Sequence, residues 1–164
     1  MPVSIRPLGK KHDRAAFSCG VEALDKYLRV QAGQDQRKGL ARVFVAEAQE
    51  RGTVAGFYTL STISVDVGAL PAELSERIPY SDVPAALIGR LAVDRRYQGQ
   101  RLGEHLLIDA LKRIVDISQT MAILAVVVDA KEGAVSFYRK YGFIPFPNRP
   151  DRLFLPVATA RKLF

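Results

Sequence analysis

Apolar and polar residues recur along the first half of the chain with the periods of strands and helices. Residues 3–7 alternate as a short strand does, and apolar residues at helical spacing predict a helix over 21–32. Residues 42–48 and 54–64 are rich in β-forming side chains and are separated by 49–52, a polar link that ends in glycine. This pattern predicts an antiparallel hairpin.

The second half continues as alternating strands and helices after a stretch interrupted by prolines. Prolines break residues 67–84, so we expect an irregular excursion there, followed by a strand over 85–93. Residues 102–119 carry one apolar stripe with charges elsewhere, which predicts an amphipathic helix lying on a sheet. Residues 122–128 are apolar throughout, as in a strand that is buried on both faces.

Aromatic residues at helical spacing predict another helix over 134–141, which Gly142 ends in a left-handed conformation. Closing strands are expected at 143–146 and 152–155. The expected order is β-α-β-β-β-α-β-α, followed by the closing strands. It corresponds to an α/β (α+β) fold, a mixed sheet with helices on both faces.

Composition sets the size and the compartment that we expect. With 164 residues and 48% hydrophobic content, residues 1–164 should form a single domain with its own core. No run approaches the roughly 18 apolar residues that span a bilayer, and no apolar run resembles a signal peptide, so we expect a cytoplasmic protein without membrane contacts. The single cysteine, Cys19, excludes an internal disulfide and a cysteine metal cluster, and we expect no metal site.

The net charge of +7 favours polyanionic partners, such as nucleic acid or a phosphorylated cofactor. A positive surface that only keeps the protein in solution is the alternative.

Glycines and arginines crowd the link between the strand at 85–93 and the helix at 102–119. Gly99 and Gly103 bare the backbone where the helix begins, so free N–H groups and the positive end of the helix dipole converge there. A pyrophosphate can bind such donors, with charge-assisted contacts from the neighbouring arginines, Arg95, Arg96 and Arg101. The spacing excludes a Walker loop and a dinucleotide-binding loop, and a glycine-rich turn with solvent-facing arginines is the alternative.

This link resembles motif A of the GNAT family of N-acetyltransferases, Arg/Gln-x-x-Gly-x-Gly/Ala. Arg96 and Gly99 occupy its first two marked places, and Arg101 departs from the usual small third residue. Residues 89–94 resemble the splayed fourth strand of that family, and residues 134–143 resemble its motif B. The resemblance implies a mostly antiparallel sheet with a splayed central strand pair, and acetyl-CoA as the acyl donor. The residues that it implies for binding the cofactor are Leu91, Ala92, Val93, Arg96, Gln98, Gly99, Gln100, Arg101, Leu102, Gly103, Glu104 and Phe137.

Acyl transfer to an amine needs a neutral amine, a donor to the developing oxyanion and an acid for the departing thiolate. The resemblance implies that Tyr138 is the acid and that the Val93 main-chain N–H is the donor; by itself, Tyr138 reads as an aromatic residue that fills the core. The strand at 85–93 holds no carboxylate or histidine that could act as a base. This favours an α-amine, with a pKa of about 7.7–8.0, over a lysine amine near 10.4. His12 and His105 are expected to be structural or solvent-facing.

Short segments at 17–28, 89–94, 137–138 and 153–156 resemble the acetyltransferase toxins of toxin–antitoxin pairs, which acetylate the α-amine of aminoacyl-tRNA and stop translation. This resemblance implies an antitoxin partner with a ribbon-helix-helix DNA-binding part, a homodimer, and operator DNA bound only through the antitoxin complex. The candidate RNA contacts are Arg37, Lys38, Arg42, Arg90, Arg139 and Lys140, and in a wider set Lys10, Lys11, Arg149 and Arg152. Each of them is alternatively an ordinary solvated charge.

Two other functions fit the same residues. The first is a GNAT enzyme that acetylates a small amine, such as an antibiotic or a polyamine, or a protein N-terminus. The second is a non-catalytic module that binds acetyl-CoA and works through partner contacts.

Overall fold

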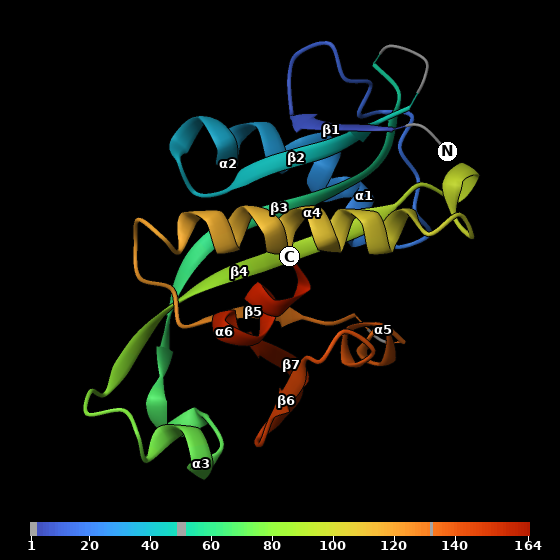
Figure 1. Cartoon of the computed structure of the whole chain (residues 1–164). Coiled ribbons are helices and arrows are strands. Elements are labelled where there is room, and N and C mark those ends of the chain that lie inside the picture. The colour runs from blue at the N-terminus through green and yellow to red at the C-terminus, as the bar shows by residue number, and fades with distance from the viewer. Residues whose placement is uncertain (1–2, 49–51, 132) are drawn as a thin grey trace. The chain divides into compact units, whose positions relative to one another are not determined.

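The computed structural model describes residues 3–48, 52–131 and 133–164. Within them, hydrogen bonding orders a seven-stranded sheet as β1-β2-β3-β4-β5-β7-β6 (Figure 1). β4 and β5 run parallel, whereas β1 with β2, β2 with β3, β5 with β7 and β6 with β7 run antiparallel. The expected mixed, mostly antiparallel sheet is thus confirmed.

The helices and strands follow the expected order, with several short helical turns added. The strands are β1 (Ser4–Pro7), β2 (Arg42–Glu47), β3 (Val54–Asp66), β4 (Asp82–Val93), β5 (Ala125–Asp129), β6 (Ile144–Phe146) and β7 (Arg149–Pro156). The α-helices are α1 (Glu22–Lys26), α2 (Ala32–Lys38), α3 (Ala72–Ser75), α4 (Leu102–Ile117), α5 (Val135–Arg139) and α6 (Val157–Ala160). A π-helical turn, η1 (Tyr27–Gln31), joins α1 to α2, and three 3-10 turns are η2 (Val67–Ala69), η3 (Arg95–Tyr97) and η4 (Arg161–Leu163).

The chain forms two compact units. The first unit holds Met1–Ser61 and Gly89–Ala110, and the second holds Thr62–Ile88 and Leu111–Phe164. β3, β4 and α4 each contribute residues to both units. The single domain expected from chain length stays a prediction.

Neighbouring residues on β3 show that helices cover both faces of the sheet in the first unit. A Cβ added to Gly56 would lie 2.8 Å from Leu106 Cδ1 of α4 and 2.9 Å from the Ala92 carbonyl oxygen, so only glycine lets α4 approach so closely. The next residue, Phe57, points to the opposite face, because side chains alternate along a strand. Its ring packs against Phe17 and Tyr27, at centroid distances of 5.4 and 6.4 Å.

The helix predicted at 21–32 is wrong at its C-terminal end. Helical structure runs from Glu22 through η1 to Lys38, and it ends at Gly39, whose φ of 75° is left-handed. Leu24, Leu28 and Ala32 face the core as their spacing predicted. Beyond Ala32 the apolar spacing lapses, and residues 33–38 are glycine or polar, so periodicity could not reveal the last helical turns.

The second unit is built on the parallel pair of β4 and β5. Ala85 to Ile88 pair with Ala125 to Val128, and the described register of this pair ends there, as expected of a splayed strand pair. β5 is buried over Ala125 to Val128, which confirms a strand covered on both faces. On its other edge β7 pairs antiparallel with it, and Phe154 of β7 packs edge-on against Phe146 of β6.

Several predicted bounds need correction. The stretch at 67–84 is not wholly irregular, because it holds η2 and α3 and because β4 already begins at Asp82. β7 begins at Arg149, three residues before the strand predicted at 152–155, and α6 was not predicted at all. The turn of the hairpin between β2 and β3 lies mostly outside the described residues, but the antiparallel pairing itself is confirmed.

No helix among residues 3–48, 52–131 and 133–164 combines the length and the apolar character that crossing a membrane requires.

Candidate functional site

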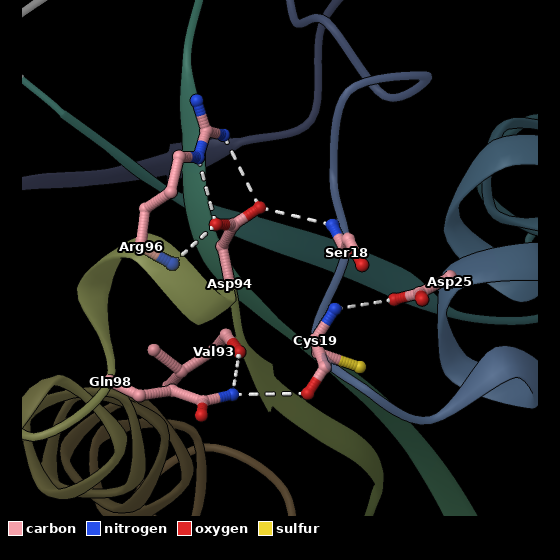
Figure 2. A network of polar contacts seen from close by, with 7 residues as sticks. All are labelled: Ser18, Cys19, Asp25, Val93, Asp94, Arg96 and Gln98. Atoms are coloured by element: carbon pink, nitrogen blue, oxygen red, sulfur yellow. Dashed lines mark hydrogen bonds and ion pairs between the residues drawn. The ribbon is translucent and has the colours of Figure 1, made fainter.

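A buried carboxylate organises the backbone just after β4. Asp94 is only 1% exposed. Its Oδ1 accepts hydrogen bonds from the main-chain N–H and from Nε of Arg96, both at 2.9 Å. Its Oδ2 accepts from the Ser18 N–H at 3.0 Å and from Nη2 of Arg96 at 3.2 Å (Figure 2). Asp94 therefore caps the turn η3 and joins it to the segment around Ser18.

Asp94 is ionised at neutral pH despite its burial. Burial by itself raises the pKa of a carboxyl group, because the charged form loses solvation. The hydrogen bonds from the Arg96 side chain and from the Ser18 and Arg96 amides outweigh burial, so the pKa of Asp94 lies below its ordinary value.

Gln98 makes a second connection between the same two segments. Its Nε2 donates to the Val93 carbonyl at 2.9 Å and to the Cys19 carbonyl at 3.0 Å. Figure 2 shows the Gln98 amide between these two oxygens. The Cys19 N–H in turn donates to Oδ1 of Asp25 at 2.8 Å. The end of β4, the turn after it and the start of the N-terminal helix therefore form one hydrogen-bonded assembly.

The loop between η3 and α4 has two left-handed residues, Gly99 at φ 81° and Arg101 at φ 62°. Arg101 is the only described non-glycine residue with positive φ. A left-handed conformation costs an L-residue roughly 1–2 kcal/mol, and glycine adopts it freely. This explains physically why glycine occurs at the third marked place of the motif, and the departure at Arg101 creates local backbone strain.

Main-chain donors gather where α4 begins. The first helical hydrogen bond runs from the His105 N–H to the Arg101 carbonyl at 3.1 Å. The N–H groups of Leu102, Gly103 and Glu104 precede it and have no partner inside the helix. A Cβ added to Gly99 would meet nothing within 4 Å, so the space beside this glycine is open. Such a helix start suits a phosphate group.

The predicted cofactor residues of the first unit fall into groups by exposure. Gln98, Gly99, Gln100 and Arg101 are exposed, and Leu91, Val93, Gly103 and Glu104 are half-buried. Ala92 and Leu102 are buried, so only their backbone atoms can face a ligand. The guanidinium of Arg96 is 54% exposed and already holds Asp94, which gives this arginine a structural role that the sequence did not reveal.

Tyr138 and Phe137 lie in an aromatic cluster of the second unit. The Tyr138 ring packs edge-on against Phe137 at 5.1 Å and against Phe143 at 5.6 Å. Phe137 also packs against Tyr141 at 5.4 Å. Tyr138 is buried and Phe137 is half-buried, so the Tyr138 ring does fill part of the core, as the alternative interpretation expects.

Burial raises the pKa of Tyr138 to about 12, because the phenolate would lose solvation there. Among the residues that the structure describes, no hydrogen-bond partner stands at this hydroxyl, and desolvation is the only cause of the shift. Tyr138 therefore keeps its proton at neutral pH and has a donor available for a substrate.

The candidate RNA contacts belong to both units. Arg90 stacks on the Tyr27 ring at 3.5 Å, and Nη1 of Arg42 donates to the Gln36 carbonyl at 3.0 Å. The other four are exposed: Arg37 and Lys38 on α2 in the first unit, and Arg139 and Lys140 at the end of α5 in the second.

The histidines and the cysteine are structural or solvent-facing. His12 is 5% exposed, accepts from the Gly9 N–H at 2.9 Å and contacts Glu47 Oε2 at 2.7 Å, whereas His105 is exposed. Burial and Asp25 raise the pKa of Cys19 to about 11, so its thiol is not activated. Across the described ranges, no cluster of three or more potential ligands could hold a metal ion.

Sequence reasoning missed the role of Asp94, although a signal was present. An aspartate directly before a short basic turn is a frequent N-cap, and Asp94 precedes Arg95 and Arg96 in this way. Its link to Ser18 spans 76 positions and had no local signal.

Comparison with known proteins relates the chain to acetyltransferases. Residues 12–143 match the model of the Acetyltransferase (GNAT) family. The chain is 36% identical to the probable toxin TacT of Sinorhizobium fredii over an alignment of 169 positions, which covers 97% of this chain and 93% of that protein. It is 37% identical to a tRNA-acetylating toxin of Mycobacterium tuberculosis over 159 residues, with 96% and 94% covered.

Solved structures with the same fold include toxins of this kind. A mutant of KacT superposes with a TM-score of 0.93 at 29% identity, and both chains are covered completely, at 100%. AtaT complexed with acetyl-methionyl-tRNAfMet has a TM-score of 0.91 at 31% identity, with 99% of each chain covered. A tyrosine-to-phenylalanine mutant of AtaT, bound to acetyl-CoA and the C-terminus of the antitoxin AtaR, has a TM-score of 0.83 at 28% identity, with 99% and 98% covered.

Replacing Asp94 with asparagine should lower the free energy of unfolding by about 2 kcal/mol near neutral pH, because a buried ion loses its charge-assisted hydrogen bonds. The folded pKa of Asp94 lies below its unfolded value of about 3.9. The carboxylate's contribution is therefore complete above that value and is lost as pH falls through the folded pKa. Urea unfolding from about pH 3 to about pH 7 should show the two proteins converging at the acid end. Ser18→Ala, which keeps the main-chain donor, is the control, and a gap independent of pH would contradict this account.

Arg101→Gly should raise the free energy of unfolding by about 0.5 kcal/mol, since relief of the left-handed strain exceeds the extra chain entropy of glycine. Thermal unfolding of the purified protein measures this change. Arg95→Gly is the matched control, because Arg95 lies in η3 with ordinary backbone angles, and there glycine should destabilise. Equal effects of the two substitutions would show that φ at Arg101 carries no strain.

Proposed function

Because the chain belongs to the Acetyltransferase (GNAT) family, we propose that it transfers an acetyl group from acetyl-CoA to the α-amine of aminoacyl-tRNA and thereby stops translation. The chain is accordingly an N-acetyltransferase with acetyl-CoA as its acyl donor. The observation that carries the choice of acceptor is the likeness to AtaT complexed with acetyl-methionyl-tRNAfMet, over 99% of both chains at 31% identity.

The loop before α4 suits the pyrophosphate of the donor. The N–H groups of Leu102, Gly103 and Glu104 precede the first helical hydrogen bond, and they supply donors at the positive end of the helix dipole. Open space beside Gly99 admits a phosphate, and the exposed Arg101 and Gln100 border it. Leu91 and Val93, at the end of β4, offer backbone groups to the pantetheine arm.

Tyr138 is the proposed acid. When acetyl-CoA is bound, it supplies a thioester carbonyl as the electrophile. The amine nitrogen forms the new C–N bond as the C–S bond breaks, and the Tyr138 hydroxyl gives its proton to the departing sulfur. The proton that the nitrogen loses returns through water to the Tyr138 oxygen. The pKa of about 12 keeps the Tyr138 hydroxyl protonated at neutral pH, so its proton is present when the sulfur departs. The Val93 N–H is the proposed donor to the oxygen that gains charge.

An α-amine acceptor agrees with the lack of a carboxylate or histidine in residues 85–93 of β4. Residues 85–93 include no carboxylate or histidine, so the acceptor must reach the site largely neutral. An α-amine, with a pKa near 7.7–8.0, meets this condition at neutral pH far better than a lysine side chain. The net charge of +7 suits the phosphates of tRNA.

The proposal extends to partners and location. An antitoxin that carries a ribbon-helix-helix DNA-binding part would neutralise the enzyme, and operator DNA would be bound only through that complex. A homodimer of one-domain protomers, spanning residues 1–164, is the proposed assembly. Charged tRNA as substrate implies a cytoplasmic enzyme. The likeness to AtaT bound to the C-terminus of AtaR supports the antitoxin part of the proposal.

The purified protein with radiolabelled acetyl-CoA should label charged tRNA and leave uncharged tRNA unlabelled, because only the charged form has an α-amine. Acid precipitation of the tRNA after short incubations measures the transfer. Antibiotics, polyamines and peptides with free N-termini serve as competing acceptors. Transfer to one of these with none to charged tRNA would overturn the acceptor assignment, and transfer to no acceptor would favour the non-catalytic module.

Tyr138→Phe should lower kcat by about 10²–10⁴-fold, the usual range for loss of a general acid, while leaving acetyl-CoA affinity unchanged. Single-turnover transfer to charged tRNA measures the rate, and titration calorimetry measures the affinity. Tyr80→Phe, at a residue that is 73% exposed, is the control and should keep the full rate. A full rate in Tyr138→Phe would refute its role as the acid.

A further inference from the structure

Two arginines of the first unit converge on one glycine of α2. Nη1 of Arg14 lies 2.8 Å, and Nη1 of Arg37 lies 3.3 Å, from the point where a Cβ of Gly33 would stand. The absent side chain is the space into which both guanidinium groups reach. Arg14 comes from the segment after β1, and Arg37 comes from the last turn of α2.

Neither guanidinium has a carboxylate to balance it in the described ranges of the chain. Other arginines do: Arg96 holds Asp94 and Arg152 holds Asp129. Asp35, on the same helix, is occupied by the Tyr27 hydroxyl and by the Gln31 amide at 2.8 and 2.9 Å. Two like charges that meet without a counter-ion repel each other, and a bound anion would remove that repulsion.

Gly33 lowers the stability of the helix at its position. It lies inside the continuous helical segment from Glu22 to Lys38, and glycine is the least favourable residue in a helix interior apart from proline. Its backbone has no positive φ that would require glycine. The close approach of the two arginines is the one local feature that a larger residue would disturb.

We propose that Arg14, Gly33 and Arg37 form a binding site for a phosphodiester group of the RNA acceptor. The planar fork of each guanidinium matches phosphate oxygens, and a pair of forks can grip one phosphate from two sides. Two exposed cations extend the positive charge: Lys38 is the last residue of α2, and Arg42 of β2 donates to the Gln36 carbonyl of α2. Such an extended charge suits a polyanion with regularly spaced phosphates. This inference rests on the proposed function, since it assigns part of the surface that receives tRNA.

Gly33→Ala provides the sharpest test because it changes no charge. Its Cβ would push the flexible end of Arg14 away, while alanine favours the helix, so the melting temperature should stay equal or rise. Binding of fluorescent uncharged tRNA to the full-length protein, followed by anisotropy over a range of salt, should weaken severalfold. The Arg14→Gln, Arg37→Gln double variant should weaken binding about tenfold and reduce the slope of log affinity against log salt by about 1.

The matched control is the Lys26→Gln, Arg29→Gln double variant. It removes the same charge from exposed positions of the same helical segment, where Arg29 already faces Glu22 at 3.5 Å. The control should keep the wild-type salt slope. Equal losses in both double variants, or unchanged tRNA binding in Gly33→Ala and the arginine variant, would overturn the site.

Competition with polyglutamate separates RNA from an acidic peptide as the occupant. If the arginine variant kept its tRNA affinity but lost its affinity for polyglutamate, the site would belong to a peptide and the RNA assignment would be wrong. The proposed function is tested separately by acetyl transfer from wild-type protein to charged tRNA. Absence of that transfer would refute the acceptor and leave the binding result for uncharged tRNA standing.

Discussion

The buried carboxylate of Asp94 is the constraint on which the first unit depends. An ion that is 1% exposed must have its oxygens occupied by donors, because an unpaired buried charge costs several kcal/mol. Arg96 and the Ser18 N–H meet this requirement, and in doing so they determine where the chain goes after β4. Gln98 repeats the connection through the carbonyls of Val93 and Cys19. The N-terminal segment is therefore part of the loop's support, although it lies far away in sequence.

With its entry held in this way, the loop can reach the start of α4 in an unusual conformation. Gly99 and Arg101 both take left-handed backbone angles, and α4 then begins with its first N–H groups unpaired inside the helix. Glycine adopts such angles without strain, whereas at Arg101 they cost conformational free energy. The same loop contains no carboxylate before Glu104, which leaves the surroundings of these donors favourable to an anion.

The proposed reaction places phosphate binding and proton donation in opposite environments. Phosphate binding relies on backbone dipoles and exposed cations at the start of α4, where the phosphate charge stays in contact with water and meets groups of opposite charge. Proton donation relies on Tyr138 among aromatic rings, where burial raises the pKa to about 12 and keeps the hydroxyl protonated. In the proposed reaction the acceptor contributes its own neutral amine, which agrees with the lack of a carboxylate or histidine in residues 85–93. The arginine pair over Gly33 would then bind a phosphodiester group of the acceptor.

The sequence by itself determined the approximate places of the strands, the helix α4 and the glycine-rich, basic character of the loop before it. Periodicity predicted the helix at 102–119 to within two residues of α4, and the apolar run at 122–128 contains most of β5. These features are local: a period of 3.6 or a continuous apolar run can be read from neighbouring residues. The pattern does not predict the helical extension from Gly33 to Lys38, because helical turns made of polar residues carry no apolar period.

Only the tertiary structure decided which polar groups meet. The guanidinium of Arg96, a predicted pyrophosphate contact, holds Asp94, and Asp94 meets Ser18 across 76 positions. Arg14 converges with Arg37 because Gly33, on the same helix as Arg37, leaves room for both guanidinium groups. Such encounters depend on how distant segments pack, and no local pattern records them, because the free energy of a buried charge is set by its neighbours in space.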